Sequence, residues 1–232
     1  MKDIFGTAIL DYQLGNYSED LITSTSISEA DSLPLPYLFR NYSEMPCLEK
    51  TALKLSRGTV LDIGCGAGSH SLYLKSKGLK VKSIDISAGA IEACRLRGLR
   101  QAHVLNVMDE TSSFDTLLLL MNGSGVFQSL ANTPFVLSHL KKLINPDGQI
   151  LIDSSDIKYM YENEIGGYCM DATKDYYGEL DYTVRYKDQE ATFSWMYVDF
   201  ENLKIACEQA GLICELIEEG PHFDYLAKIT LA

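Results

Sequence analysis

Positive charge is scarce in this sequence. The chain has 20 Lys and Arg against 32 Asp and Glu, which gives a formal net charge of −12 and an isoelectric point near 4.7. Nucleic acids and anionic membrane surfaces bind cationic proteins, so this balance disfavours both partners. Pro (6) and Gly (17) are too few for a collagen-like or low-complexity chain, and the hydrophobic content of 46% can fill a core. We therefore expect one globular domain with small additions.

Long apolar runs, a basic leader and paired cysteines are also missing. The longest apolar run, Thr116 to Met121, is far shorter than the roughly 20 residues that cross a bilayer. The first thirty residues contain several acidic side chains and no continuous apolar stretch, unlike a signal peptide. The six cysteines (at 47, 65, 94, 169, 207 and 214) form neither a CxxC pair nor a metal-like spacing with His. These absences predict no membrane span, no export, no metal site, and reduced thiols in a cytoplasmic protein.

The middle and end of the chain alternate between short apolar runs and helical patterns. Strands are expected at 59–63, 81–85, 101–105, 115–121, 149–153, 212–217 and 225–231, and helices at 47–55, 72–78, 87–98, 136–143 and 200–211. The strands before residue 154 are apolar throughout rather than alternating, as in parallel strands covered on both faces. The pattern predicts an α/β protein with a doubly wound sheet.

Two segments fall outside this alternation. Residues 1–46 are polar and Tyr-rich, and we expect an irregular arm or lid followed by a main domain over 47–232. Residues 154–198 begin with an aromatic, acidic stretch and continue with two alternating runs, 180–186 and 191–198, which predict a β-hairpin. We expect this hairpin to be an insertion in the sheet's edge region that lies over the carboxyl edge, on the substrate side.

A glycine-rich turn follows the first predicted strand. Gly64, Gly66 and Gly68 alternate directly after Asp62, where missing side chains let a ligand approach backbone N–H groups at a helix start. A dinucleotide loop would have its last glycine where Ser69 stands. A carboxylate at position 62 would repel a diphosphate and attract a cation. The turn therefore predicts a ligand with a cationic group.

This turn resembles the nucleotide loop of the class I S-adenosylmethionine (SAM)-dependent methyltransferases, which reads acidic-x-G-x-G-x-G after the first strand. Asp85 matches the family's acidic residue that binds the ribose hydroxyls, and Asn106 the residue that faces the adenine amino group. The segment 121–123 matches the end of the fourth strand, beneath the transferable methyl group. The resemblance covers about 58–153 and 199–231 and implies a Rossmann-like, seven-stranded sheet whose last strand is antiparallel.

The resemblance implies SAM as cofactor and a set of residues that contact it. These are Arg40, Asp62, Gly64, Cys65, Gly66, Ala67, Gly68, Asp85, Ile86, Asn106, Val107, Met121, Asn122 and Gly123. Arg40 is included because its planar guanidinium is well shaped to bind the methionine carboxylate. No catalytic residue is assigned, because a sulfonium methyl group is already electrophilic and mainly needs an aligned acceptor.

Several residues keep a second interpretation. Asn106 also suits a local Asx turn, Asn122-Gly123 a plain turn, and Arg40 a solvated surface position. His70 suits either the methionine carboxylate or a cover over the helix start. The tyrosines of 154–198 suit a substrate pocket or an ordinary half-buried hairpin.

Three functions compete at this point. The acidic composition and the two additional segments favour methyl transfer to a small molecule. An RNA or protein methyltransferase would need a basic face that the composition does not provide. An NAD-dependent oxidoreductase, or a SAM-binding protein without transfer activity, is the remaining alternative. The oligomeric state is not predicted.

Overall fold

The computed structural model describes residues 2–162, 168 and 175–232. Part of the predicted aromatic, acidic stretch, at 163–167 and 169–174, lies outside the described residues, and so does Cys169. The other five cysteines are free thiols.

A seven-stranded sheet forms the centre of the molecule, in the order β10-β11-β7-β6-β3-β4-β5. Its strands are β3 (Thr59–Ile63), β4 (Lys80–Asp85), β5 (Ala102–Val104), β6 (Phe114–Leu119), β7 (Ile144–Ser155), β10 (Leu212–Glu219) and β11 (Asp224–Leu231). The strands from β3 to β7 pair in parallel, whereas β11 is antiparallel to both neighbours. The predicted doubly wound, Rossmann-like sheet with an antiparallel last strand is confirmed.

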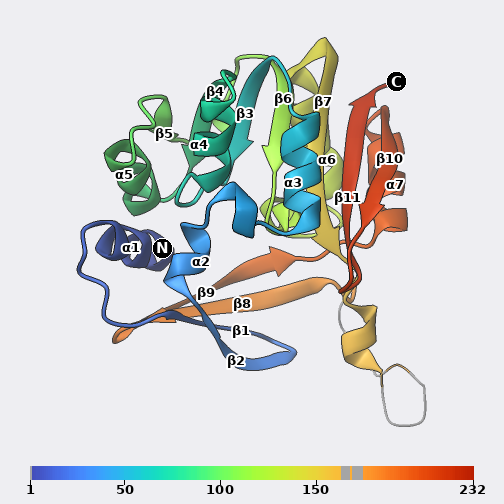
Figure 1. Ribbon diagram of the computed structural model, residues 1–232. Coiled ribbons are helices and arrows are strands. Elements are labelled where there is room, and N and C mark those ends of the chain that lie inside the picture. The colour runs from blue at the N-terminus through green and yellow to red at the C-terminus, as the bar shows by residue number, and fades with distance from the viewer. Residues whose placement is uncertain (1, 163–167, 169–174) are drawn as a thin grey trace.

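Helices cover both faces of this sheet (Figure 1). They are α3 (Cys47–Leu55), α4 (Ser69–Ser76), α5 (Ala88–Leu96), α6 (Thr133–Lys142) and α7 (Phe200–Gln209). Along β6, Leu117 and Leu119 belong to the core cluster shared with α6 and α7, and Leu118 belongs to the cluster shared with α3 and α4. Because successive strand side chains point to opposite faces, an unbroken apolar strand is what a sheet buried on both faces requires.

The N-terminal segment is regular, so the expectation that residues 1–46 are irregular is wrong. It contains α1 (Ile4–Gln13), β1 (Leu21–Thr25), β2 (Ser28–Leu33), α2 (Leu35–Leu38) and the 3-10 turn η1 (Tyr42–Glu44). Asp3 caps α1 by accepting a hydrogen bond from the Gly6 N–H, and Ile4, Ala8 and Ile9 bury one face of it. These are ordinary helix signals.

The predicted hairpin forms as β8 (Glu179–Tyr186) and β9 (Gln189–Met196). However, it pairs with the N-terminal strands in a second sheet of order β2-β1-β8-β9 and does not extend the main sheet. Ile22 of β1 faces Arg185 of β8 in this pairing. The hairpin is an insertion, as expected, but it belongs to a second sheet, which the sequence did not predict. Figure 1 shows the second sheet lying across the end of the main sheet where β7 finishes.

No helix within residues 2–162, 168 and 175–232 is long and apolar enough to span a membrane. The cytoplasmic location stays a prediction from the sequence.

Candidate functional site

The glycine turn joins the end of β3 to the start of α4. Gly64, Gly66 and Gly68 all have left-handed φ angles, of 69°, 52° and 81°. A Cβ atom added to Gly64 or Gly66 would meet nothing within 4 Å, whereas one at Gly68 would collide with Cys94 and Leu99. Gly68 is therefore required by packing. The first two glycines leave open space beside their backbone, as a ligand loop requires.

Asp85 ends β4 and connects two adjacent turns. Its Oδ2 accepts a hydrogen bond from the Gly66 N–H and its Oδ1 accepts one from the Ser87 N–H, both at 2.9 Å. Burial raises the pKa of this carboxyl group, and the two N–H donors oppose that rise. The carboxylate lies at the C-terminal edge of the sheet, where doubly wound proteins bind their ligands.

Asp62 is buried, with 2% of its surface exposed. Its Oδ2 accepts a hydrogen bond of 2.6 Å from Ser71 Oγ, and the Ser71 and Ser83 hydroxyls lie 2.7 Å apart. Burial raises the pKa of Asp62. In this structure its carboxylate fastens the end of β3 to α4.

Arg40 is buried rather than solvated, with 6% of its surface exposed. Its Nη2 forms an ion pair with Glu49 Oε1, and its Nη1 donates to the Tyr37 carbonyl at 2.6 Å. Its Nε is buried without a hydrogen-bond partner. Such an orphaned donor is costly, so an acceptor that is absent from the chain itself is expected there.

Glu49 lies between the Arg40 guanidinium and the His70 imidazole. Besides Arg40, it contacts His70, whose Nε2 is 2.7 Å from Glu49 Oε2. Burial alone would raise the pKa of Glu49, but His70 and Arg40 outweigh it and hold the pKa below its usual value. Sequence reasoning missed Glu49. The available signal was an acidic residue beside Leu48 on the apolar face of a short helix.

The loop after β5 holds Asn106 and Val107. Asn106 is exposed, and its Oδ1 accepts a hydrogen bond from the Met108 N–H at 2.9 Å, which is the Asx-turn geometry. Val107 is buried, and its carbonyl lies 2.9 Å from His139 Nε2. Ile86, across the same edge, has 74% of its surface exposed.

The turn after β6 is strained. Met121 and Asn122 have left-handed φ angles of 65° and 60°, which non-glycine residues rarely adopt. Asn122 Nδ2 donates to the Met196 carbonyl of β9 at 3.2 Å. The following 3-10 turn, η3 (Gly123–Phe127), packs against Trp195 at Gly125, where a Cβ atom would collide with the indole ring. The second sheet is thus fastened to the end of β6.

Asp153 holds this turn from the end of β7. Its Oδ2 and Oδ1 accept hydrogen bonds from the Met121 and Gly123 N–H groups, each at 3.0 Å. Burial raises its pKa to about 6. Sequence reasoning did not assign this residue, although a carboxylate that ends the strand beside β6 falls at the ligand edge by the same rule that selected Asp85.

These residues suit a nucleoside that carries an amino-acid tail. Open space flanks the first two glycines, Asp85 presents a carboxylate for a diol, and Arg40 has an unsatisfied buried donor. The site therefore fits SAM on its own geometry.

Comparisons with known proteins agree with this geometry. A family model described as a methyltransferase domain matches residues 54–189. A SAM-dependent methyltransferase from Bacteroides fragilis, solved in complex with S-adenosyl-L-homocysteine, is 42% identical with a TM-score of 0.93, over 100% of this chain and 95% of that one. An uncharacterised methyltransferase of Staphylococcus carnosus is 28% identical over 83% of this chain and 86% of its own length.

A shorter match is to a malonyl-[acyl-carrier protein] O-methyltransferase of Serratia marcescens, 26% identical over 41% of this chain and 37% of that protein. The chain thus spans little more than a third of this relative. The glycine turn, the strand order and these matches together show that the chain belongs to the class I SAM-dependent methyltransferases.

Proposed function

We propose that this methyltransferase acts on a small-molecule acceptor bound between the C-terminal edge of the main sheet and the second sheet. The observation that carries the proposal is the attachment of β9 to the turn after β6, through Asn122 and Trp195. The second sheet is thereby attached over the turn that Asp153 holds. A covered site of this kind suits a small acceptor better than a polymer.

We propose the following roles on the cofactor side. Asp85 binds the ribose hydroxyls, Arg40 Nε binds the methionine carboxylate, and Asp62 contributes negative charge near the amino group. The adenine lies between Ile86 and Val107, with Asn106 at its amino group. The backbone around Cys65 and Ala67 lines the turn, and the segment 121–123 lies beside the methyl group. When bound, SAM supplies an electrophilic methyl group, and the chain's task is to align the acceptor and exclude water.

We also propose that residues 1–46 act with the insertion 154–198 as the acceptor-side cover over the domain 47–232. The pairing of β1 with β8 joins the two segments in one sheet. Because β1 and β2 come from the N-terminal segment, its removal would leave the β8–β9 hairpin without its partner strand.

Charge supports a neutral or cationic acceptor. The chain carries a net charge of −12, and the site's buried Arg40 is already paired with Glu49. A phosphate backbone would find little attraction here, which argues against an RNA substrate.

The acceptor class can be tested with methyl-labelled SAM and a cell extract divided by ultrafiltration. We expect label to be transferred in the small-molecule fraction and not in the RNA and protein fraction. Transfer confined to the macromolecular fraction would overturn the proposal. The background is measured with the Asp85→Ala variant, whose weaker cofactor binding should lower transfer strongly in both fractions.

A further inference from the structure

Asp153 differs from the other carboxylates of the site in what it contacts. Glu49 contacts Arg40 and His70, and Asp62 is buried and accepts a hydrogen bond from Ser71. Asp85 lies at the proposed ribose end of the site. Asp153 is half-buried and is held by the backbone N–H groups of the turn after β6. A carboxylate has about four acceptor positions, so these two bonds fix its orientation and leave lone pairs for another partner.

Asp153 lies beside the turn 121–123, which is proposed to face the methyl group. Asp153 belongs to β7, the strand that pairs with β6 in the main sheet. Met121 and Asn122 in this turn both adopt the left-handed conformation, which costs energy for residues other than glycine. Strain of this kind concentrates at functional sites.

We propose that Asp153 is the proton acceptor of the reaction and that the acceptor atom is a hydroxyl or amine that enters the site with its proton. This inference rests on the proposed function. In the step, the acceptor atom forms a bond to the methyl carbon, the carbon–sulfur bond breaks with its electron pair remaining on sulfur, and the proton passes from the acceptor to Asp153. The positive charge on sulfur and the negative charge on Asp153 disappear together, so no net charge is left in the covered site.

The electrostatic surroundings of Asp153 agree with this role. Burial raises its pKa to about 6, the two N–H donors lower it, Glu49 on α3 raises it, and His70 on α4 lowers it. Tyr37 of α2 also lies within electrostatic reach. A carboxylate titrating near 6 is a stronger base than an ordinary aspartate, yet it is still ionised at neutral pH.

The test uses SAM and S-adenosylhomocysteine, which differ only in the methyl group and the charge on sulfur. At pH 6, about half of Asp153 is protonated in the free protein, because its pKa is about 6. A sulfonium beside it lowers that pKa, so SAM binding should release up to about half a proton more than S-adenosylhomocysteine binding. Calorimetric titrations in two buffers of different ionisation enthalpy measure this difference.

Two variants and one pH series complete the experiment. Asp153→Asn should remove the difference in proton release, whereas Asp115→Asn should keep it, because Asp115 accepts its hydrogen bonds from Thr59 and Asn145 at the opposite end of β6. In the unmodified protein, the ratio of SAM affinity to S-adenosylhomocysteine affinity should rise with pH, by up to tenfold per unit below about 6, and level off above about 7. This series needs no variant and stands even if Asp153→Asn does not fold.

The outcomes separate the inference from the proposed function. Equal proton release by the two ligands, together with a pH-independent affinity ratio, would overturn the role of Asp153 and leave the small-molecule proposal intact. Persistence of the difference in Asp153→Asn would overturn it as well. The proposed acceptor class itself fails only in the extract experiment, through transfer confined to the macromolecular fraction.

Discussion

Replacing Asp85 with alanine should weaken S-adenosylhomocysteine binding by about 100-fold or more. Two hydrogen bonds from ribose hydroxyls to a carboxylate are each expected to contribute about 1.5–3 kcal/mol, and the loss of roughly 3 kcal/mol corresponds to about 100-fold. The substitution also removes the acceptor for the Gly66 N–H, which helps to shape the glycine turn. Isothermal titration at pH 7.5 measures the effect.

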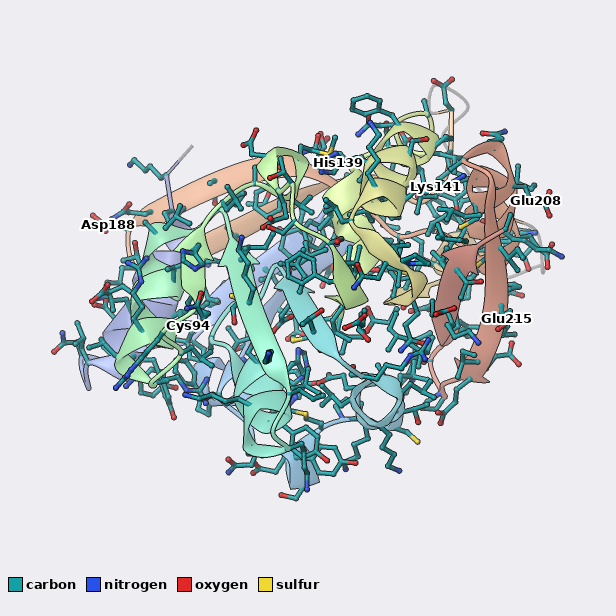
Figure 2. All side chains as sticks on the ribbon, turned by 90° about the horizontal axis from the view of Figure 1, so that it is seen from above. Cys94, His139, Lys141, Asp188, Glu208 and Glu215 are labelled. Atoms are coloured by element: carbon teal, nitrogen blue, oxygen red, sulfur yellow. The ribbon has the colours of Figure 1, made fainter. Side chains whose placement is uncertain are left out.

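The matched control for Asp85→Ala is Asp188→Ala. Asp188 is exposed at the tip of the β8–β9 hairpin, on the outer surface of the molecule (Figure 2). This substitution removes the same charge at a distance from the glycine turn, and it should change affinity by less than about twofold, because exposed charges are screened. An Asp85→Ala protein that binds as tightly as the control would refute the ribose role.

The second large effect is expected on stability, from Glu49→Ala. The substitution leaves the buried Arg40 guanidinium without its counter-charge, and breaking a buried ion pair in this way typically costs about 3–5 kcal/mol. For a chain of this size the melting temperature should fall on the order of 10 °C. Thermal unfolding followed by circular dichroism at pH 7 gives the value.

A double variant distinguishes charge from packing. Arg40→Met combined with Glu49→Leu replaces the pair by apolar side chains of similar volume, and it should be more stable than Glu49→Ala alone. The pH dependence has a defined sign. The pKa of Glu49 is lower in the folded protein than in the unfolded chain. Ionised Glu49 therefore stabilises the folded protein at pH values above the pKa of the unfolded chain. This stabilisation is lost as the pH falls through the pKa of the folded protein. If Glu49→Ala melts at the same temperature as the unmodified protein at pH 7, the stabilising role of the Arg40–Glu49 ion pair is refuted.

The sequence predicted the main sheet because each of its signals is local. The run Thr59–Ile63 is apolar enough to be recognised alone, the glycines that follow it end it, and Ser87 caps the next helix by accepting a hydrogen bond from the Ala90 N–H. Continuous apolar strands separated by helices admit few arrangements other than a parallel sheet. The seven strands and the antiparallel last strand followed from the family resemblance.

The second sheet could not be predicted, because its pairing is not local. Ile22 pairs with Arg185 across most of the chain, and β2 is polar, with Glu29, Asp31 and Ser32 in its six residues. Such a strand has no apolar face that would reveal it before its partner is known. From the sequence alone, residues 1–46 therefore read as an irregular arm.

Some residues of the candidate site were likewise predicted from the sequence, and others were not. Asp85 and the glycines were found because strand ends and turns are visible in the sequence. Glu49 and Asp153 were not, because their importance comes from groups that meet only in the folded chain: Arg40 and His70 for Glu49, and the turn after β6 for Asp153.

The most direct measurement is a crystal structure of the protein with S-adenosylhomocysteine. The account predicts the nucleoside beside Gly64 and Gly66, with both ribose hydroxyls on the Asp85 carboxylate and the amino-acid carboxylate on Arg40 Nε. A ligand located elsewhere, or a complex in which Asp85 and Arg40 contact only their own chain, would contradict it.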